Sequence, residues 1–287
     1  MRYACVRAHR GEYPVRMMCR LLEVSRSGFY AWLVRSESLR VRQDVRLVVE
    51  IREIHLVTRG SYGSPRIHEE LRGRGYGCGR NRVARLMRVH GIAAKRGRRF
   101  RRTTDSDHGY RVVPNLLRER PAASCPDKVW VADITYLWTR EGWLYLATVM
   151  DLYSRLIVGW ATGVRIERWL VLEAFQQAFS MRRPGPELIH HSDRGSQYAS
   201  REFQELLVRY GVRGSMSGRG KCYDNAAMES FFGSLKVEWT EGRSYATREE
   251  AQQDLFKYIE LFYNRRRRHS SLGYVSPAEF ERNQAVA

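Results

Sequence analysis

Apolar residues recur at helical spacing over the first 90 positions of the chain. Apolar runs at 17–22 and 29–33 are separated by Ser-Arg-Ser-Gly at 25–28, which predicts two short helices joined by a turn. This helix-turn-helix pattern is weak on its own, because it also occurs in cores that never contact DNA. Longer helices are predicted at about 41–56, 66–71 and 81–90.

The helix predicted at 81–90 carries arginines outside its apolar face. Val83, Leu86 and Met87 share one face, whereas Arg82 and Arg85 fall on others. The second helix of a helix-turn-helix pair lies in the major groove with such side chains pointing outward. We therefore expect Arg82 and Arg85 to contact nucleic acid.

A different pattern begins near residue 128. Segments 129–137, 143–149 and 156–161 are rich in β-branched, aromatic and aliphatic residues and predict three adjacent strands in a meander. Helical and extended segments then alternate, and two helices close the chain, which is typical of a mixed sheet flanked by helices. These later elements are expected at 167–180, 187–191, 200–210, 212–216, 225–238 and 248–263.

Residues 103–127 separate the two patterns. This stretch is polar and is interrupted by Pro114, Pro121 and Pro126, which is typical of a linker. We therefore expect a helical DNA-binding region with a basic arm at 1–102, a linker at 103–127 and an α/β domain at 128–287.

Positive charge is concentrated in the front of the chain. Residues 1–124 hold 28 basic and 11 acidic side chains, a net charge of +17, whereas residues 125–287 hold 22 and 20, a net charge of +2. Almost all of the excess is arginine, which binds phosphate oxygens with a planar fork. A basic surface also aids solubility, but its density at 95–102 favours nucleic acid as the partner. The arm comprises Lys95, Arg96, Arg98, Arg99, Arg101 and Arg102.

Cysteine usage and hydropathy exclude several classes of protein. The five cysteines are scattered without a Cys-x-x-Cys pair, so neither a disulfide framework nor a zinc site is expected. His190 and His191 are expected to flank the turn at Asp193 rather than to bind zinc. The apolar runs are far shorter than the roughly 20 residues of a membrane span, and no signal-peptide pattern opens the chain. A cytoplasmic, nucleoid-associated protein without a membrane partner is expected.

Three carboxylates form the candidate chemical site. Asp133 lies within a predicted strand, Asp193 follows the end of another, and Glu229 lies on a predicted helix, with 35 residues between it and Asp193. Taken singly, Asp193 is more typical of a turn and Glu229 of an exposed helix position. Taken together with the basic front, they favour a shared site for a pair of divalent cations, the machinery that moves phosphodiester bonds.

Lys236 follows Glu229 by seven residues. At about 100° per residue the two side chains share one face of the helix, about 10 Å apart along its axis. A cation there would hold a DNA phosphate beside the carboxylates, although a solvated lysine is the ordinary alternative.

Five strings in the second half closely resemble the DDE, integrase-like transposases of bacterial insertion sequences, in particular the second-reading-frame protein of a two-frame element. The family shares the retroviral-integrase catalytic core. The strings are Trp-Val-Ala-Asp-Ile-Thr-Tyr at 130–136, Gly-Trp-Leu-Tyr-Leu at 142–146 with Asp-Leu-Tyr-Ser-Arg at 151–155, His-Ser-Asp-Arg-Gly at 191–195, Asn-Ala-Ala-Met-Glu at 225–229 with Lys236, and the stretch from Tyr263 to Pro277. The front resembles the family's helical DNA-binding region at 19–32 and 62–67, so the resemblance covers nearly the whole chain.

The resemblance implies an RNase H-like fold, a mixed five-stranded sheet flanked by helices, behind an all-α helix-turn-helix region. It implies that Asp133, Asp193 and Glu229 bind two Mg²⁺ or Mn²⁺ ions and that Lys236 lies near the transposon end. Tyr263, Asn264 and His269 are also implied to lie near DNA.

The implied reaction is 3′-end cleavage and strand transfer of an insertion sequence. Its DNA partners are the terminal inverted repeats and the target, bound by a homo-oligomer of the chain. An upstream-frame helix-turn-helix and leucine-zipper protein is a further implied partner, because no heptad run precedes residue 130.

Two other functions remain open on the sequence. The chain would be a non-catalytic DNA-binding subunit or regulator of transposition if the sheet domain served only assembly. An RNase H or Holliday-junction nuclease on the same fold is disfavoured by the large basic front.

Overall fold

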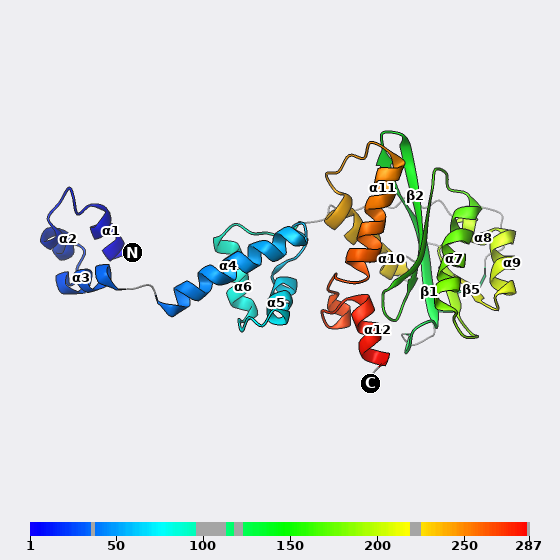
Figure 1. Ribbon diagram of the computed structural model, residues 1–287, viewed down its shortest axis with the longest axis horizontal. Coiled ribbons are helices and arrows are strands. Elements are labelled where there is room, and N and C mark those ends of the chain that lie inside the picture. The colour runs from blue at the N-terminus through cyan, green and yellow to red at the C-terminus, as the bar shows by residue number, and fades with distance from the viewer. Residues whose placement is uncertain (36–37, 96–112, 118–122, 219–224, 286–287) are drawn as a thin grey trace.

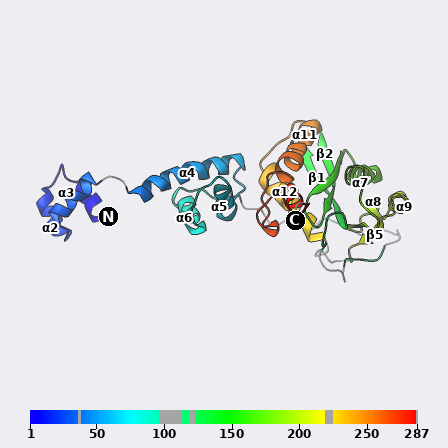
Figure 2. The same ribbon diagram turned by 60° about the horizontal axis from the view of Figure 1, so that its bottom comes forward.

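The computed structural model describes residues 1–35, 38–95, 113–117, 123–218 and 225–285, and shows an elongated molecule with three parts in a row (Figure 1). A small three-helix part at the N-terminus is followed by a second helical part and then by an α/β part, an order that Figure 2 shows from another side. No helix in these ranges is long and apolar enough to cross a membrane.

The N-terminal part contains α1 (Arg2–Ala8), α2 (Val15–Leu21) and α3 (Arg26–Val34). Val6, Met18 and Phe29 form its small core. The turn predicted from Ser-Arg-Ser-Gly starts α3, because the Ser25 hydroxyl accepts a hydrogen bond from the Gly28 N–H at 3.2 Å and so caps the helix.

The middle part contains α4 (Leu39–Val57), α5 (Ser64–Gly73) and α6 (Arg80–Val89). Ile54, Ile67, Leu71 and Val83 lie at the centre of this trio and are almost fully buried. All three helices agree with the periodicity of the sequence, since each needs a single apolar face to pack on the other two.

The α/β part is built on a five-stranded mixed sheet in the order β3-β2-β1-β4-β5. The strands β1 to β3 form the predicted antiparallel meander, and β4 and β5 extend it in parallel with β1. Their bounds are β1 (Val129–Thr139), β2 (Gly142–Asp151), β3 (Ile157–Gly163), β4 (Ile189–Ser192) and β5 (Arg213–Met216).

Helices cover both faces of the sheet. On one face lie α7 (Arg168–Arg182), α8 (Ser196–Ala199) and α9 (Arg201–Arg209), which pack on Trp130 and Val149. Gly159 in β3 lets α7 approach closely, because a Cβ there would lie 2.3 Å from the carbonyl oxygen of Ala174. The other face carries α10 (Ala226–Ser234), its π-helical continuation η2 (Leu235–Thr240), α11 (Arg248–Phe256) and the π-helical η3 (Lys257–Tyr263). The short helix η4 (Ser270–Leu272) and α12 (Pro277–Ala285) end the chain.

The middle part is joined to the α/β part by polar contacts. The Tyr62 hydroxyl accepts a hydrogen bond from the Arg268 backbone N–H at 2.8 Å, and the Arg268 guanidinium donates to Glu70 at 2.7 Å. Nearby, Arg267 is buried and donates two hydrogen bonds of 2.6 Å to Glu238. The charges of Arg267 and Arg268 are thus each paired with a glutamate, as buried charges require.

Candidate active site

Asp133 and Asp193 are brought together by the parallel pairing of β1 and β4. Val131 pairs with His191 and Ala132 with Ser192, so the next residues along the two strands are the two aspartates. Both side chains are half-buried. Two carboxylates that are far apart in the sequence therefore lie on neighbouring strand paths.

Backbone amides orient these carboxylates. One oxygen of Asp133 accepts from the Ile134 N–H at 2.7 Å. One oxygen of Asp193 accepts from the Gly195 N–H at 2.9 Å, which closes a tight turn directly after β4. A side chain at Gly195 would crowd this turn, because a Cβ there would lie 3.0 Å from the same oxygen of Asp193.

Glu229 lies in the first turn of α10 and is exposed. The helix is held on the sheet by Met228, Phe231 and Phe232, which are buried. At the start of α10, the Asn225 side-chain amide donates to the Ala132 carbonyl at 3.3 Å, one residue before Asp133. Asn225 thus ties the helix of Glu229 to the strand of Asp133, a positioning role that its place at a predicted helix start could have suggested.

The acidic residues act on one another electrostatically. Burial raises the pKa of Asp133 to about 8, with further increases from the charges of Asp193 and Glu229. The hydrogen bond from Ile134 and the charge of Lys236 act in the opposite direction. The four predicted side chains therefore share one electrostatic environment.

Lys236 lies on η2, where the helix widens after α10. Its ammonium group is 5.4 Å from the ring centroid of Tyr136, a cation–π distance. Burial lowers the pKa of Lys236, and the attraction of Asp133 opposes that change. The side chain is thus directed at the acidic site.

The carboxylates suit a hard divalent cation by their chemistry. All three offer only oxygen donors, and the raised pKa of Asp133 reflects negative charge gathered in a poorly solvated place. Within the described ranges, no three His, Cys, Asp or Glu side chains are close enough to hold one metal ion together. The site thus has suitable ligand atoms, but its three carboxylates lie farther apart than they would if all of them bound one ion.

Comparison with known protein families identifies two kinds of domain in the chain. An integrase core domain model matches residues 123–246, a second integrase core domain model matches 229–285, and an HTH-like domain model matches 42–100. The IS600 uncharacterized 31 kDa protein of Shigella sonnei is 46% identical over 263 residues, which are 92% of this chain and 97% of that protein. The InsF transposase of insertion sequence IS3A from Escherichia coli strain K12 is 44% identical over 283 residues, 98% of each chain. The chain belongs to the IS3-family transposases.

Among solved structures, the catalytic core domain of HTLV-2 integrase in complex with magnesium shares 16% identity with this transposase. The match covers 55% of this chain and 98% of the HTLV-2 integrase chain, with a TM-score of 0.42. The predicted integrase-type mixed sheet and helical HTH-like front are confirmed by the family matches and by the fold itself.

His190 and His191 of the transposase are structural residues on β4. The ring nitrogens of His191 lie 2.8 Å from the Ser215 hydroxyl and 3.0 Å from the Ser217 hydroxyl. Burial and the neighbouring His191 lower the pKa of His190 to about 3, so its ring is neutral. The two residues brace the strand that carries Asp193, in agreement with their expected place beside the turn.

Three residues predicted to lie near DNA are buried in the α/β part. Tyr263 and His269 are 3% and 8% exposed, and their ring centroids lie 4.8 Å apart. Asn264 is 6% exposed and hydrogen-bonds through both side-chain atoms to the backbone of Ile157. In this structure the three side chains are enclosed by packing, and their role near DNA stays a prediction.

Three of the remaining basic candidates, Arg82, Arg85 and Lys95, lie in or directly after the helices of the middle part. Arg82 and Arg85 both donate to Asp44, at 2.7 and 2.6 Å, although Arg85 is exposed. Lys95 is exposed, and its backbone N–H donates to the Gly60 carbonyl. The other arm residues, Arg96, Arg98, Arg99, Arg101 and Arg102, lie outside the described residues.

Proposed function

We propose that Asp133, Asp193 and Glu229 are the catalytic carboxylates with which this transposase cleaves the 3′ ends of its element and joins them to target DNA. The observation that carries the proposal is the β1–β4 register, which brings Asp133 beside Asp193 although the two are distant in the sequence. The influence of Glu229 and Lys236 on the pKa of Asp133 supports a common site.

The three carboxylates would hold Mg²⁺ or Mn²⁺, as two ions. When bound, such ions activate the attacking oxygen and stabilise the leaving oxygen of an in-line phosphoryl displacement. The backbone amides of Ile134 and Gly195 occupy one oxygen of each aspartate and thereby fix its orientation. Asn225 anchors α10 to β1, so Glu229 would reach the site from a helix, whereas the two aspartates reach it from strands.

Lys236 would hold a DNA phosphate next to the carboxylates. Its ammonium group lies 5.4 Å from the ring centroid of Tyr136 and interacts electrostatically with Asp133, which supports a place beside the carboxylates. Arg82, Arg85, Lys95 and the rest of the basic arm would hold the flanking duplex, for which Arg82 and Arg85 must exchange Asp44 for phosphate.

A strand-cleavage and strand-transfer assay with end-containing DNA tests the catalytic assignment. Asp133→Asn, Asp193→Asn and Glu229→Gln keep the size of each side chain, and each is expected to lower the rate by about 100-fold or more. Glu173→Gln, a change on α7 away from the three carboxylates, is the matched control and should leave the rate unchanged. Full activity in an Asp193→Ala protein would remove the assignment, and end binding without nicking in any divalent metal would favour a non-catalytic subunit.

The active assembly is proposed to be a homo-oligomer on the element ends, aided by an upstream-frame helix-turn-helix and leucine-zipper protein and associated with the nucleoid. Mass photometry of the chain on end DNA, with and without the upstream-frame protein, tests this. A single copy that performs concerted joining of two ends would contradict it.

A further inference from the structure

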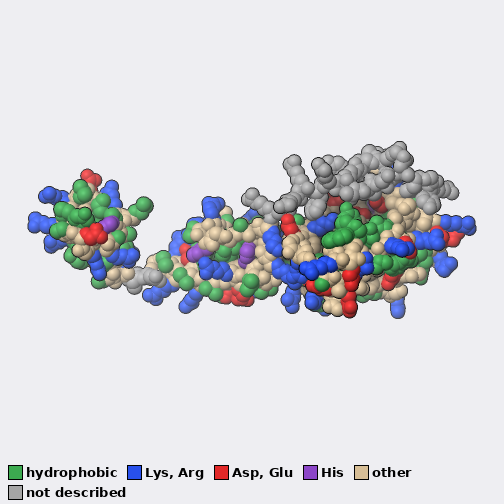
Figure 3. All heavy atoms as spheres, turned by 90° about the horizontal axis from the view of Figure 1, so that it is seen from above, with side chains coloured by type: hydrophobic (Ala, Val, Ile, Leu, Met, Phe, Trp, Pro, Cys, Tyr) green, Lys and Arg blue, Asp and Glu red, His purple; other side chains and the backbone are tan. Residues whose placement is uncertain are grey.

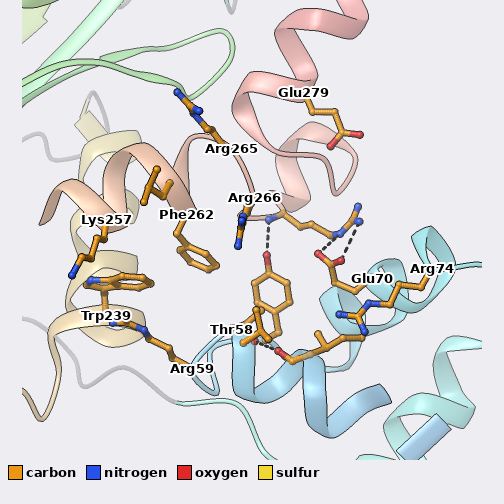
Figure 4. A pocket seen from close by; sticks show the side chains of 15 residues that line it. Thr58, Arg59, Glu70, Arg74, Trp239, Lys257, Phe262, Arg265, Arg266 and Glu279 are labelled. Atoms are coloured by element: carbon orange, nitrogen blue, oxygen red, sulfur yellow. Dashed lines mark hydrogen bonds and ion pairs between the residues drawn. The ribbon is translucent and has the colours of Figure 1, made fainter. Parts of the chain in front are cut away.

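A pocket of about 530 Å³ opens where the middle part meets the α/β part (Figure 4). One wall comes from the end of α4 and from α5, and the other from η2, η3 and the chain after η3. None of its lining residues belongs to the acidic site or to the predicted DNA contacts.

The lining is strongly basic. Six Lys or Arg side chains face two glutamates, Glu70 and Glu279. Arg268 pairs with Glu70, and Arg74 pairs with Glu50 and Glu53. The other four cations make no salt bridge with any residue that the structure describes, and they are Arg59, Lys257, Arg265 and Arg266.

Arg59 forms part of the pocket floor. Its guanidinium carbon lies 3.3 Å from the ring centroid of Trp239. Figure 4 shows the Arg59 side chain reaching toward this ring. One of its terminal nitrogens, Nη1, is buried and has no hydrogen-bond partner among the described residues. Burial and then the nearby charge of Arg243 lower the pKa of Arg59, and the charges of Asp254 and Tyr245 act in the opposite direction. An unsatisfied buried donor is costly, and an anion in the pocket would satisfy it.

The mouth of the pocket carries the other cations. Lys257, Arg265 and Arg266 are exposed on η3 and on the chain after it. Lys95, the first residue of the basic arm, is hydrogen-bonded through its backbone to Gly60, directly after Arg59. Figure 3 shows Lys and Arg side chains gathered where the middle and α/β parts meet. The pocket therefore continues the basic surface from the HTH-like part onto the integrase core.

We propose that this junction pocket binds a backbone phosphate of the DNA strand. Arg59 would donate from the floor, and Lys257 and Arg266 would close on the phosphate from the mouth, with the exposed apolar side chains of Val57 and Leu261 beside the sugar. Arginine and lysine together on a concave surface match a phosphodiester, whose charge and acceptor oxygens they complement. The inference rests on the proposed function only in that DNA is the partner.

A lysine acetylation footprint tests the site directly. The chain has five lysines, so mass spectrometry can follow each one in the full-length protein. With end-containing duplex in EDTA, the reactivity of Lys257 should fall several-fold, whereas Lys128, which lies outside the pocket beside Glu187, should keep its reactivity. Unchanged Lys257, or equal protection of Lys128, would overturn the proposal.

The footprint also separates the pocket from the catalytic site. Protection of Lys236 with no change at Lys257 would contradict phosphate binding in the pocket and leave the proposed function unaffected. Protection of Lys257 in a protein that never cleaves DNA would support phosphate binding in the pocket and contradict the proposed catalysis. If inorganic phosphate at matched ionic strength protects Lys257 as fully as DNA does, the pocket is a simple anion site and its assignment to DNA is wrong.

The salt dependence of binding gives a second test. Arg265→Ala/Arg266→Ala should weaken DNA binding and flatten the slope of log K against log salt by about 0.9 for each phosphate that the variant no longer neutralises. The matched control is Arg209→Ala/Arg213→Ala, which removes two exposed arginines on α9 and β5, outside the pocket, and should leave the slope unchanged. Equal slopes for the pocket and control variants would contradict the proposal, and circular dichroism confirms that each variant is folded.

Discussion

Asn264 satisfies both backbone hydrogen-bonding groups of a single residue, Ile157 at the start of β3. Its Oδ1 accepts from the Ile157 N–H at 3.0 Å, and its Nδ2 donates to the Ile157 carbonyl at 3.0 Å. Two segments 107 residues apart are thus joined by a pair of hydrogen bonds that resembles one rung of a sheet.

Replacing Asn264 by Leu should destabilise the protein rather than abolish DNA binding. The change leaves the N–H and carbonyl of Ile157 buried without partners, at a cost of about 1–3 kcal/mol for each group. Urea unfolding should show the decrease in stability, while the folded fraction binds end DNA with the affinity of the wild type. A large decrease in affinity at unchanged stability would support the predicted role near DNA.

Asp133→Asn should raise the melting temperature of the metal-free protein. Burial and the charges of Asp193 and Glu229 disfavour the ionised carboxylate in the folded state, and the amide carries no charge. Added Mg²⁺ should stabilise the wild type and have much less effect on the variant, because ligand binding stabilises the state that binds it. Differential scanning fluorimetry measures both changes, and an equal response to Mg²⁺ in the two proteins would argue against Asp133 as a ligand.

The stability of the fold should fall in acid through His269. Burial, together with the charges of Arg267 and Arg66, lowers the pKa of His269 to about 2 in the folded state. Its ordinary value is about 6.5, so between these two values the unfolded chain binds the extra proton. The contribution of neutral His269 to the free energy of unfolding is complete above about pH 6.5 and is lost as the pH falls toward about 2.

Unfolding measured by urea between pH 4 and 8 checks this contribution. The slope from His269 should approach about 1.4 kcal/mol per pH unit below its unfolded pKa. His190 acts in the same direction. His269→Asn should therefore flatten the profile without removing it, and an unchanged slope in the variant would show that His269 is protonated in the folded protein.

Glu238→Gln should weaken the interface between the middle and α/β parts. Glu238 accepts hydrogen bonds from Arg267 and Arg66, and the glutamine would leave the buried guanidinium of Arg267 without a counter-charge. Removing one member of a buried ion pair costs about 3–5 kcal/mol. Thermal or urea unfolding detects the decrease, for which exposed Glu241→Gln is the control, and a decrease no larger than that of the control would contradict this account of the interface.

The strands and helices of this protein could be predicted closely from the sequence. The meander at 129–161 and the trio of helices in the middle part depend on local periodicity, which each segment carries by itself. The predicted helices at 225–238 and 248–263 occur as well, although each ends as a π-helix that the periodicity did not indicate.

The contacts and burial of single polar residues could not be predicted as well. Arg82 and Arg85 are paired with Asp44, about forty positions away, because α6 packs against α4. Asn264 and His269, which the family resemblance implies to lie near DNA, are enclosed by the core. A side chain's exposure depends on contacts with segments distant in sequence, so spacing and residue type alone do not decide it.

The amino-acid sequence by itself determined the local elements, the placement of positive charge in the front of the chain and the kinds of side chain available for chemistry. The tertiary structure decided which of them meet: the parallel register aligned Asp133 with Asp193, and the docking of the middle part placed Arg59 against Trp239. The physical reason is that periodicity and charge are local properties of each segment. Strand register and the docking of the middle part depend instead on packing between segments that are far apart in the sequence.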